Sequence, residues 1–185
     1  MHETGSGPGR PGRDECQPYY FEYIDLVPDG HVVTLLERQI GETAAYLAGL
    51  TPEQALRREA PAEWNAVEIV GHLADTERVY EYRALRIARA DPVMWTPIEF
   101  PAYAAAANFQ ERPLGDVVAE FAAVRAAFVA LLRGLDEAAW ERRSPADWTL
   151  RSVRAVAYTM AGHELHHLAS IRRQQGGQRS EAVPG

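Results

Sequence analysis

Four long segments of the chain carry apolar residues at intervals of three and four, which is the spacing of one face of an α-helix. These segments span residues 30–48, 65–90, 113–133 and 149–175. No stretch of useful length alternates apolar and polar residues, so the pattern argues against a β-sheet as the main element. Each helix must bury its apolar face against another helix, and the 185-residue chain is therefore predicted to fold as an all-α four-helix bundle.

Local signals predict where these helices begin and end. Asn65 is followed by Glu68 three residues later, which is a capping-box signature at the start of the second helix. Thr149 is predicted to cap the fourth helix, and the glycine pair that begins at Gly176 is predicted to end it. Residues 91–112 hold several prolines and aromatic side chains, and they are predicted to form a long connection of the kind that often carries function.

The bundle domain is predicted to occupy residues 16–175. Residues 1–15 are rich in glycine, proline and arginine, a composition that predicts a disordered N-terminal tail. The aromatic segment 19–27 is predicted to pack on the bundle as an extended lead-in. Residues 176–185 are polar and are predicted to form a flexible C-terminal tail.

Composition argues against several classes of function. The formal net charge is −7 and no basic stripe is interleaved with aromatic residues, so the chain is not expected to bind nucleic acid. No run of about 18 apolar residues is present, which argues against a membrane span. The basic residues are all arginine, which excludes chemistry that needs a lysine. The single cysteine, Cys16, cannot form an internal disulfide and no signal-peptide pattern is present, so a cytoplasmic location is predicted.

Histidines are the candidate functional residues. His163 and His167 are four residues apart on the fourth predicted helix, so their imidazoles share a face and can converge on one metal ion. His72 lies on the apolar face of the second predicted helix and is expected to point into the bundle, where side chains of facing helices build metal sites. Three neutral imidazoles would leave a coordination position open for water or substrate.

Other interpretations of the same histidines remain open. Histidines on an apolar face can also be hydrogen-bonded core residues that bind no metal. Residues 163–167 read H-E-x-x-H, the zinc-protease signature, but the extended form of that motif needs glycine and histidine where this chain has Ser170 and Arg173. Too little chain follows for a further ligand helix, so a protease is not favoured. Glu164 is expected to face a neighbouring surface or solvent, and His166 to lie at the edge of the inward face.

Asp75 is the candidate catalytic or supporting carboxylate. It follows His72 by three residues and therefore lies close to the same helix face. It could accept the second imidazole N–H of His72, or act as a base toward the nucleophile. The alternative is an ion pair with Arg78 or Arg83.

Two stretches of the sequence resemble the DinB/YfiT-like superfamily of four-helix-bundle metalloproteins. EWNAVEIVGHLADTE, residues 63–77, is similar to the start of that family's second helix, with the pattern W-x3-E-[IV]-x2-H-[LI]-x-D-x-E. LRSVRAVAYTMAGHELHHLASIR, residues 150–172, is similar to its closing helix, with the pattern H-x2-HH-x3-I. The resemblance covers about residues 29–175.

The resemblance implies more than a bundle. It implies up-down-down-up connectivity and one divalent metal ion, zinc or nickel, held by His72, His163 and His167. It also implies a homodimer. Relatives include transferases and isomerases that use low-molecular-weight thiols such as bacillithiol or mycothiol, and many members are described only as metal-dependent hydrolases. The family usually has glutamine where this chain has Ser170, which leaves the substrate undetermined.

The leading prediction is a metal-dependent enzyme that activates a thiol or water against a small-molecule electrophile. Thiol S-transfer is the first version and hydrolysis the second. Trp95, Phe100 and Tyr103 of the long connection are predicted to form walls of the substrate pocket. The alternatives are a non-catalytic metal- or ligand-binding bundle, and a structural bundle that binds no metal.

Overall fold

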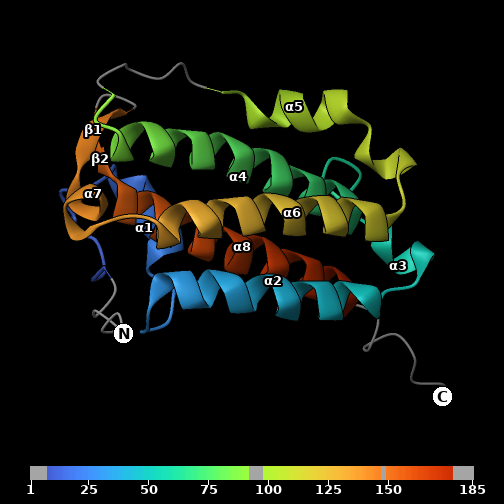
Figure 1. Ribbon diagram of the computed structural model, residues 1–185. Coiled ribbons are helices and arrows are strands. Elements are labelled where there is room, and N and C mark those ends of the chain that lie inside the picture. The colour runs from blue at the N-terminus through green and yellow to red at the C-terminus, as the bar shows by residue number, and fades with distance from the viewer. Residues whose placement is uncertain (1–7, 92–97, 147–148, 177–185) are drawn as a thin grey trace.

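Four long helices dominate the computed structural model, which describes residues 8–91, 98–146 and 149–176 (Figure 1). Apart from Gly176, the predicted C-terminal tail lies outside the described residues. The fold is an all-α four-helix bundle, as predicted. Its long helices are α2 (Val32–Ala48), α4 (Ala66–Ala88), α6 (Leu114–Arg133) and α8 (Val153–Gly176).

The connectivity is up-down-down-up. Figure 1 shows α4 and α6 running in one direction and α2 and α8 running in the opposite direction. The chain therefore has to return along α4 before α6 can start, and α5 (Phe100–Ala107) with η2 (Phe109–Glu111) makes this return. The long connection was predicted, but its helix was not. Pro101 in the first turn and the run of alanines after it favour that helix locally.

The predicted start of α4 is confirmed. The Asn65 side chain accepts from the Glu68 backbone N–H at 3.0 Å, and the Glu68 carboxylate accepts from the Asn65 N–H at 2.9 Å. A second capping box, at Thr51, starts the short helix α3 (Pro52–Ala55). Both boxes depend on contacts within four residues, which is why the sequence alone reveals them.

The predicted start of α8 is wrong by one turn. Thr149–Ser152 forms strand β2, which pairs antiparallel with β1 (Arg143–Ala146), and α7 (Glu137–Glu141) precedes this hairpin. The Ser152 hydroxyl caps the helix by accepting from the Ala155 N–H at 3.0 Å, and Thr149 lies in β2. The backbone groups of residues 149–152 find partners in β1, and this pairing outweighs the local helix signal.

The aromatic segment before α2 is helical, not extended. It forms η1 (Pro18–Tyr20) and α1 (Phe21–Ile24), and it packs on the bundle as predicted. Its contact with α8 is made at Gly162, where a Cβ would overlap the backbone carbonyl of Tyr23. Glycine therefore allows α1 to lie directly on α8.

Part of the predicted N-terminal tail belongs to the bundle. The Arg10 guanidinium donates to the carbonyl oxygens of Ile24 and Val27, at 2.7 and 2.6 Å. Glu15 is only 1% exposed and accepts two hydrogen bonds from Arg154 of α8, at 2.7 and 2.6 Å. Composition suggested disorder here, but these charged side chains have specific partners that lie far away in the sequence.

Candidate metal centre

Three histidines converge at the interface of α4 and α8. The Nε2 atom of His163 lies 3.2 Å from Nε2 of His72 and 3.0 Å from Nε2 of His167. One ligand atom from each of the three side chains lies within 4.8 Å of the other two. Tetrahedral zinc, with Zn–N bonds of about 2.0–2.1 Å, places neighbouring nitrogens roughly 3.3 Å apart. The spacing of the three imidazoles thus fits a divalent ion.

A glycine precedes the first histidine on each of the two helices. A Cβ at Gly71, before His72, would overlap the ring of Phe109 from η2. A Cβ at Gly162, before His163, would overlap the backbone of Tyr23. A neighbouring segment therefore packs against each helix directly beside its histidine. Only glycine at this position allows the segment to come so close.

Burial keeps these histidines neutral. It lowers the pKa of His72 to about 4 and is the main reason that the pKa of His167 falls to about 3. The pKa of His163 is lowered as well, first by burial and then by the neighbouring histidines. A neutral imidazole carries one N–H, so Nε2 of His163 cannot donate to both of its neighbours. A bound cation would satisfy all three nitrogen lone pairs at once.

The partner of the second ring nitrogen of His72 is Thr76, not Asp75. Thr76 Oγ1 lies 3.3 Å from Nδ1 of His72, so it can accept the Nδ1–H and leave Nε2 as the metal-binding atom. Asp75 instead pairs with Arg78 at 3.2 Å, and Arg78 also pairs with Glu120 of α6. Of the two predictions for Asp75, the structure therefore has the ion pair with Arg78, which lies three residues later on the same helix.

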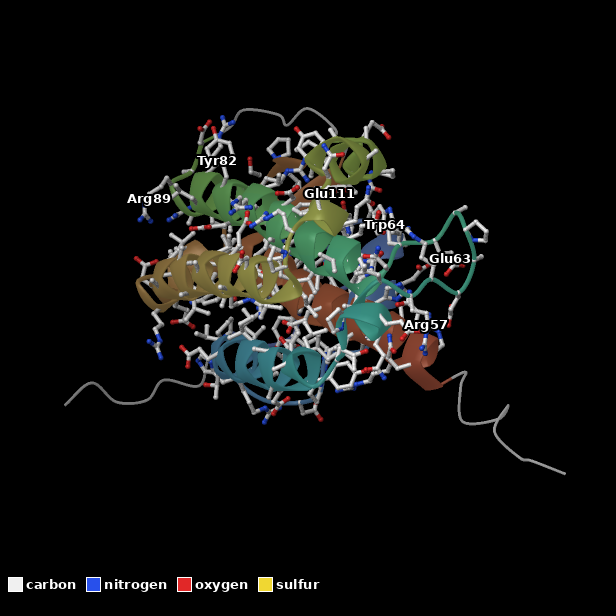
Figure 2. All side chains as sticks on the ribbon, turned by 90° about the vertical axis from the view of Figure 1, so that its right-hand side faces the viewer. Arg57, Glu63, Trp64, Tyr82, Arg89 and Glu111 are labelled. Carbon is white, nitrogen blue, oxygen red and sulfur yellow. The ribbon has the colours of Figure 1, made fainter. Side chains whose placement is uncertain are left out.

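A pocket of about 270 Å³ opens beside the histidines. The rings of Trp64 and Phe100 lie 4.8 and 5.7 Å from the ring of His72, and the Tyr23 ring lies 5.3 Å from that of His163. Trp64 is labelled in Figure 2 beside the start of α4. The lining residues are mostly aromatic or hydroxyl-bearing: Tyr19, Tyr20, Tyr23, Trp64, His72, Thr76, Tyr80, Phe100, Pro101, Thr159, Met160, His163 and His167.

Of the three walls predicted from the sequence, Phe100 is confirmed. Tyr103 is 48% exposed and does not line the pocket, and Trp95 lies outside the described residues. The sequence analysis missed the tyrosines of η1 and α1, because nothing local shows which face of the bundle that segment covers. Thr76 and Tyr80 did carry a signal, since they follow His72 at steps of four residues.

Glu164 faces away from the histidines and into the bundle. It is 1% exposed, accepts from the Thr43 hydroxyl at 2.6 Å and pairs with Arg125 at 2.8 Å. Of the two predicted environments, a neighbouring surface or solvent, the structure has the first. A carboxylate used in this way cannot serve as the general base of an H-E-x-x-H protease. His166 is exposed and does not belong to the three-histidine cluster.

Comparison with known proteins gives two findings. A family model described as the DinB superfamily matches residues 35–171. Among solved structures, the chain is similar to YfiT from Bacillus subtilis, described as a probable metal-dependent hydrolase with an unusual four-helix bundle topology. The TM-score is 0.74 at 16% identity, and the match covers 94% of this chain and 95% of that one. A search of the curated proteins gives no match.

Proposed function

This chain belongs to the DinB superfamily, and on that basis we propose that it is a metal-dependent hydrolase of a small molecule. His72, His163 and His167 would hold one divalent ion, zinc or nickel. The observation that carries this proposal is the convergence of three Nε2 atoms, from two buried histidines and one half-buried one, beside a pocket. The likeness to YfiT supports it through the shared fold.

A divalent ion held by His72, His163 and His167 would act as a Lewis acid and would supply a water-derived nucleophile at neutral pH. The other contributions come from this chain. Thr76 holds the His72 ring in the tautomer that binds metal. The rings of Trp64 and Phe100 cover His72 and exclude bulk water from it.

A low-molecular-weight thiol is the alternative nucleophile, implied by the resemblance to relatives that use such thiols. It would take the same open position. A non-catalytic metal-binding bundle is disfavoured because a site that only stores metal commonly fills all four positions with protein ligands. Here a pocket adjoins the three histidines instead.

The metal site is tested by elemental analysis of purified protein, with the wild type, His72→Ala and His166→Ala compared side by side. About one zinc or nickel ion per chain is expected in the wild type, as for a single three-histidine site. His72→Ala should lose the ion, whereas His166→Ala, which changes a neighbouring exposed histidine, should keep it. Equal metal content in all three proteins would contradict the proposed ligand set.

The reaction is tested with the metal-loaded protein and a panel of small esters and activated electrophiles, each with and without an added thiol. Hydrolysis that needs the metal and not the thiol supports the proposal. Product that forms only as a thiol conjugate would replace the hydrolase by a thiol transferase. No turnover with any member, despite a full complement of metal, would favour the binding bundle.

We also keep the homodimer and the cytoplasmic location as proposals. Light scattering on the purified chain tests the first, and localisation of a tagged chain tests the second.

A further inference from the structure

The pocket continues past the histidines along α4 and α8. His72, Thr76 and Tyr80 are four residues apart, so they line one face of α4, and all three contact the pocket. Tyr80 lies two turns beyond His72, which is about 12 Å along the helix axis. From α8, Thr159 lies one turn before His163 and lines the same space. The pocket is therefore elongated, with the metal ligands near one end.

A pair of tyrosine hydroxyls forms the other end. The hydroxyl oxygens of Tyr20 and Tyr80 lie 3.0 Å apart, and the two residues are only 6% and 5% exposed. The guanidinium carbon of Arg151 lies 3.8 Å above the Tyr20 ring and holds that ring in place. When the Tyr20 hydroxyl donates to Tyr80, the O–H of Tyr80 is left as a donor for a ligand.

The surface of this end is polar and uncharged, since no Asp, Glu or Arg side chain of the described residues lines the pocket. The guanidinium groups of Arg151 and Arg83 lie behind it, against the rings of Tyr20 and Tyr80. Burial raises the pKa of Tyr20, so its phenol stays protonated at neutral pH. Between the two ends, Phe100 and Met160 offer apolar surface. The pocket thus has a metal-binding end, an apolar middle and a hydroxyl-bearing end.

The two ends differ in where they come from along the chain. The family match begins at residue 35, so it includes the three histidines and Tyr80 but not Tyr20. Tyr20 belongs to η1, which precedes the matched region. The metal-binding end is therefore built from the shared part of the chain, and the far end is completed by a segment outside that match.

We propose that this pocket selects an elongated small molecule with an apolar middle and a hydrogen-bond-accepting oxygen at the end remote from the histidines. Tyr80 donates to that oxygen and is the specificity-determining residue, while Tyr20 and Arg151 position its hydroxyl. The inference rests on the proposed function, because the histidine-bound metal ion has to anchor the other end of the molecule.

The test uses zinc-loaded protein and two hydroxamic acids of equal chain length, since a hydroxamate binds zinc and leaves its tail in the pocket. Octanohydroxamic acid ends in a methyl group, and 7-oxooctanohydroxamic acid carries a ketone oxygen near its tail end. Calorimetry gives, for each variant, the Kd of octanohydroxamic acid divided by the Kd of 7-oxooctanohydroxamic acid. A larger value of this Kd ratio means a stronger preference for the ketone. Tyr80→Phe should reduce the preference for the ketone roughly fivefold, which corresponds to one hydrogen bond.

Tyr82→Phe is the matched control, since Tyr82 lies on the same helix but is 57% exposed and does not line the pocket (Figure 2). Its Kd ratio should equal that of the wild type. Tyr20→Phe is a second test that does not depend on the folding of the Tyr80 variant, and it should also lower the ratio, because the Tyr80 hydroxyl loses its partner.

The outcomes separate the inference from the proposed function. If zinc and both hydroxamates bind but the Kd ratio is the same in wild type, Tyr80→Phe and Tyr20→Phe, the inference is overturned and the metal centre stands. If elemental analysis finds no zinc and neither hydroxamate binds, both fall together. A ratio that drops in the two pocket variants and not in Tyr82→Phe supports the inference.

Discussion

Two clusters of polar side chains share the helices α4 and α8, and the second also includes a residue of α6. They differ in whether the cluster contains its own counter-ion. The histidine cluster joins His72 of α4 to two side chains of α8. The charged cluster joins Glu77 of α4 and Glu164 of α8 to Arg125 of α6. His163 and Glu164 are neighbours in the sequence, yet one faces the pocket and the other the bundle interior.

The charged cluster contains its own cation. Arg125 binds both carboxylate oxygens of Glu77, donates to Glu164 at 2.8 Å and donates to the Leu36 carbonyl at 3.0 Å. Burial raises the pKa of Glu77, and the guanidinium of Arg125 opposes this effect. The histidine cluster has three neutral bases, and no Arg side chain lies among them in the described part of the chain. The difference teaches that a cluster with its own counter-ion is structural, whereas convergent neutral bases can bind a cation from outside.

The largest effect is expected when the guanidinium of Arg125 is removed from the charged cluster. Arg125→Met would leave two carboxylates buried and unpaired, so we expect the free energy of unfolding to fall by about 3–5 kcal/mol. Urea denaturation measures this. Arg133→Met is the control on the same helix, because the Arg133 side chain is 65% exposed and its ion pair with Glu37 should contribute only about 1 kcal/mol or less. Equal stability of the two variants would show that the charged cluster does not hold the bundle together.

Binding of a divalent cation should stabilise the histidine cluster. Zinc at one hundred times its Kd is expected to raise the free energy of unfolding by about 2.7 kcal/mol, since only the folded chain presents the site. Thermal unfolding with zinc, and then with a chelator, measures the gain and its reversal. In His72→Ala, neither zinc nor the chelator should change the thermal unfolding. A shift in that variant equal to the wild-type shift would place the ion elsewhere.

The close approach of α1 beside the histidine cluster can be disturbed without touching a ligand. Gly162→Ala would push against the Tyr23 carbonyl, and overpacking of this kind costs about 1–3 kcal/mol. Gly41→Ala is the matched control, because a Cβ there meets open space on an exposed face of α2. It should stabilise the chain by roughly 0.5–1 kcal/mol. Chemical denaturation of both variants decides whether the contact is as tight as described.

The smallest effects are expected from two threonines, each of which contacts one of the two clusters. Thr76→Val removes the partner of His72 and should lower zinc affinity about tenfold with little change in the stability of the metal-free chain. Thr43→Val removes the hydroxyl that donates to Glu164, so it should reduce stability by about 1 kcal/mol and leave zinc affinity unchanged. Competition with a zinc-binding dye and urea denaturation give the two readouts. Identical behaviour of the two variants would erase the distinction between the clusters.

Sequence patterns predicted what depends on neighbours within about one turn. Helical spacing placed His163 and His167 on one face, and it put His72 on the inward side of α4. The capping box at Asn65 located the start of that helix. All of these signals act between residues three or four apart, where the backbone geometry of a helix fixes the distance.

Tertiary structure decided what depends on which segments meet. Strand pairing moved the start of α8 to Val153, and Glu120 of α6 pairs with Arg78, the ion-pair partner of Asp75. The tyrosines of η1 and α1 became pocket walls because this segment crosses α8, and Arg125 found its two carboxylates on two other helices. By itself the sequence determined the faces of the helices. Only their packing determined the partners, because a contact between distant segments depends on the whole arrangement and leaves no periodic signal in either one.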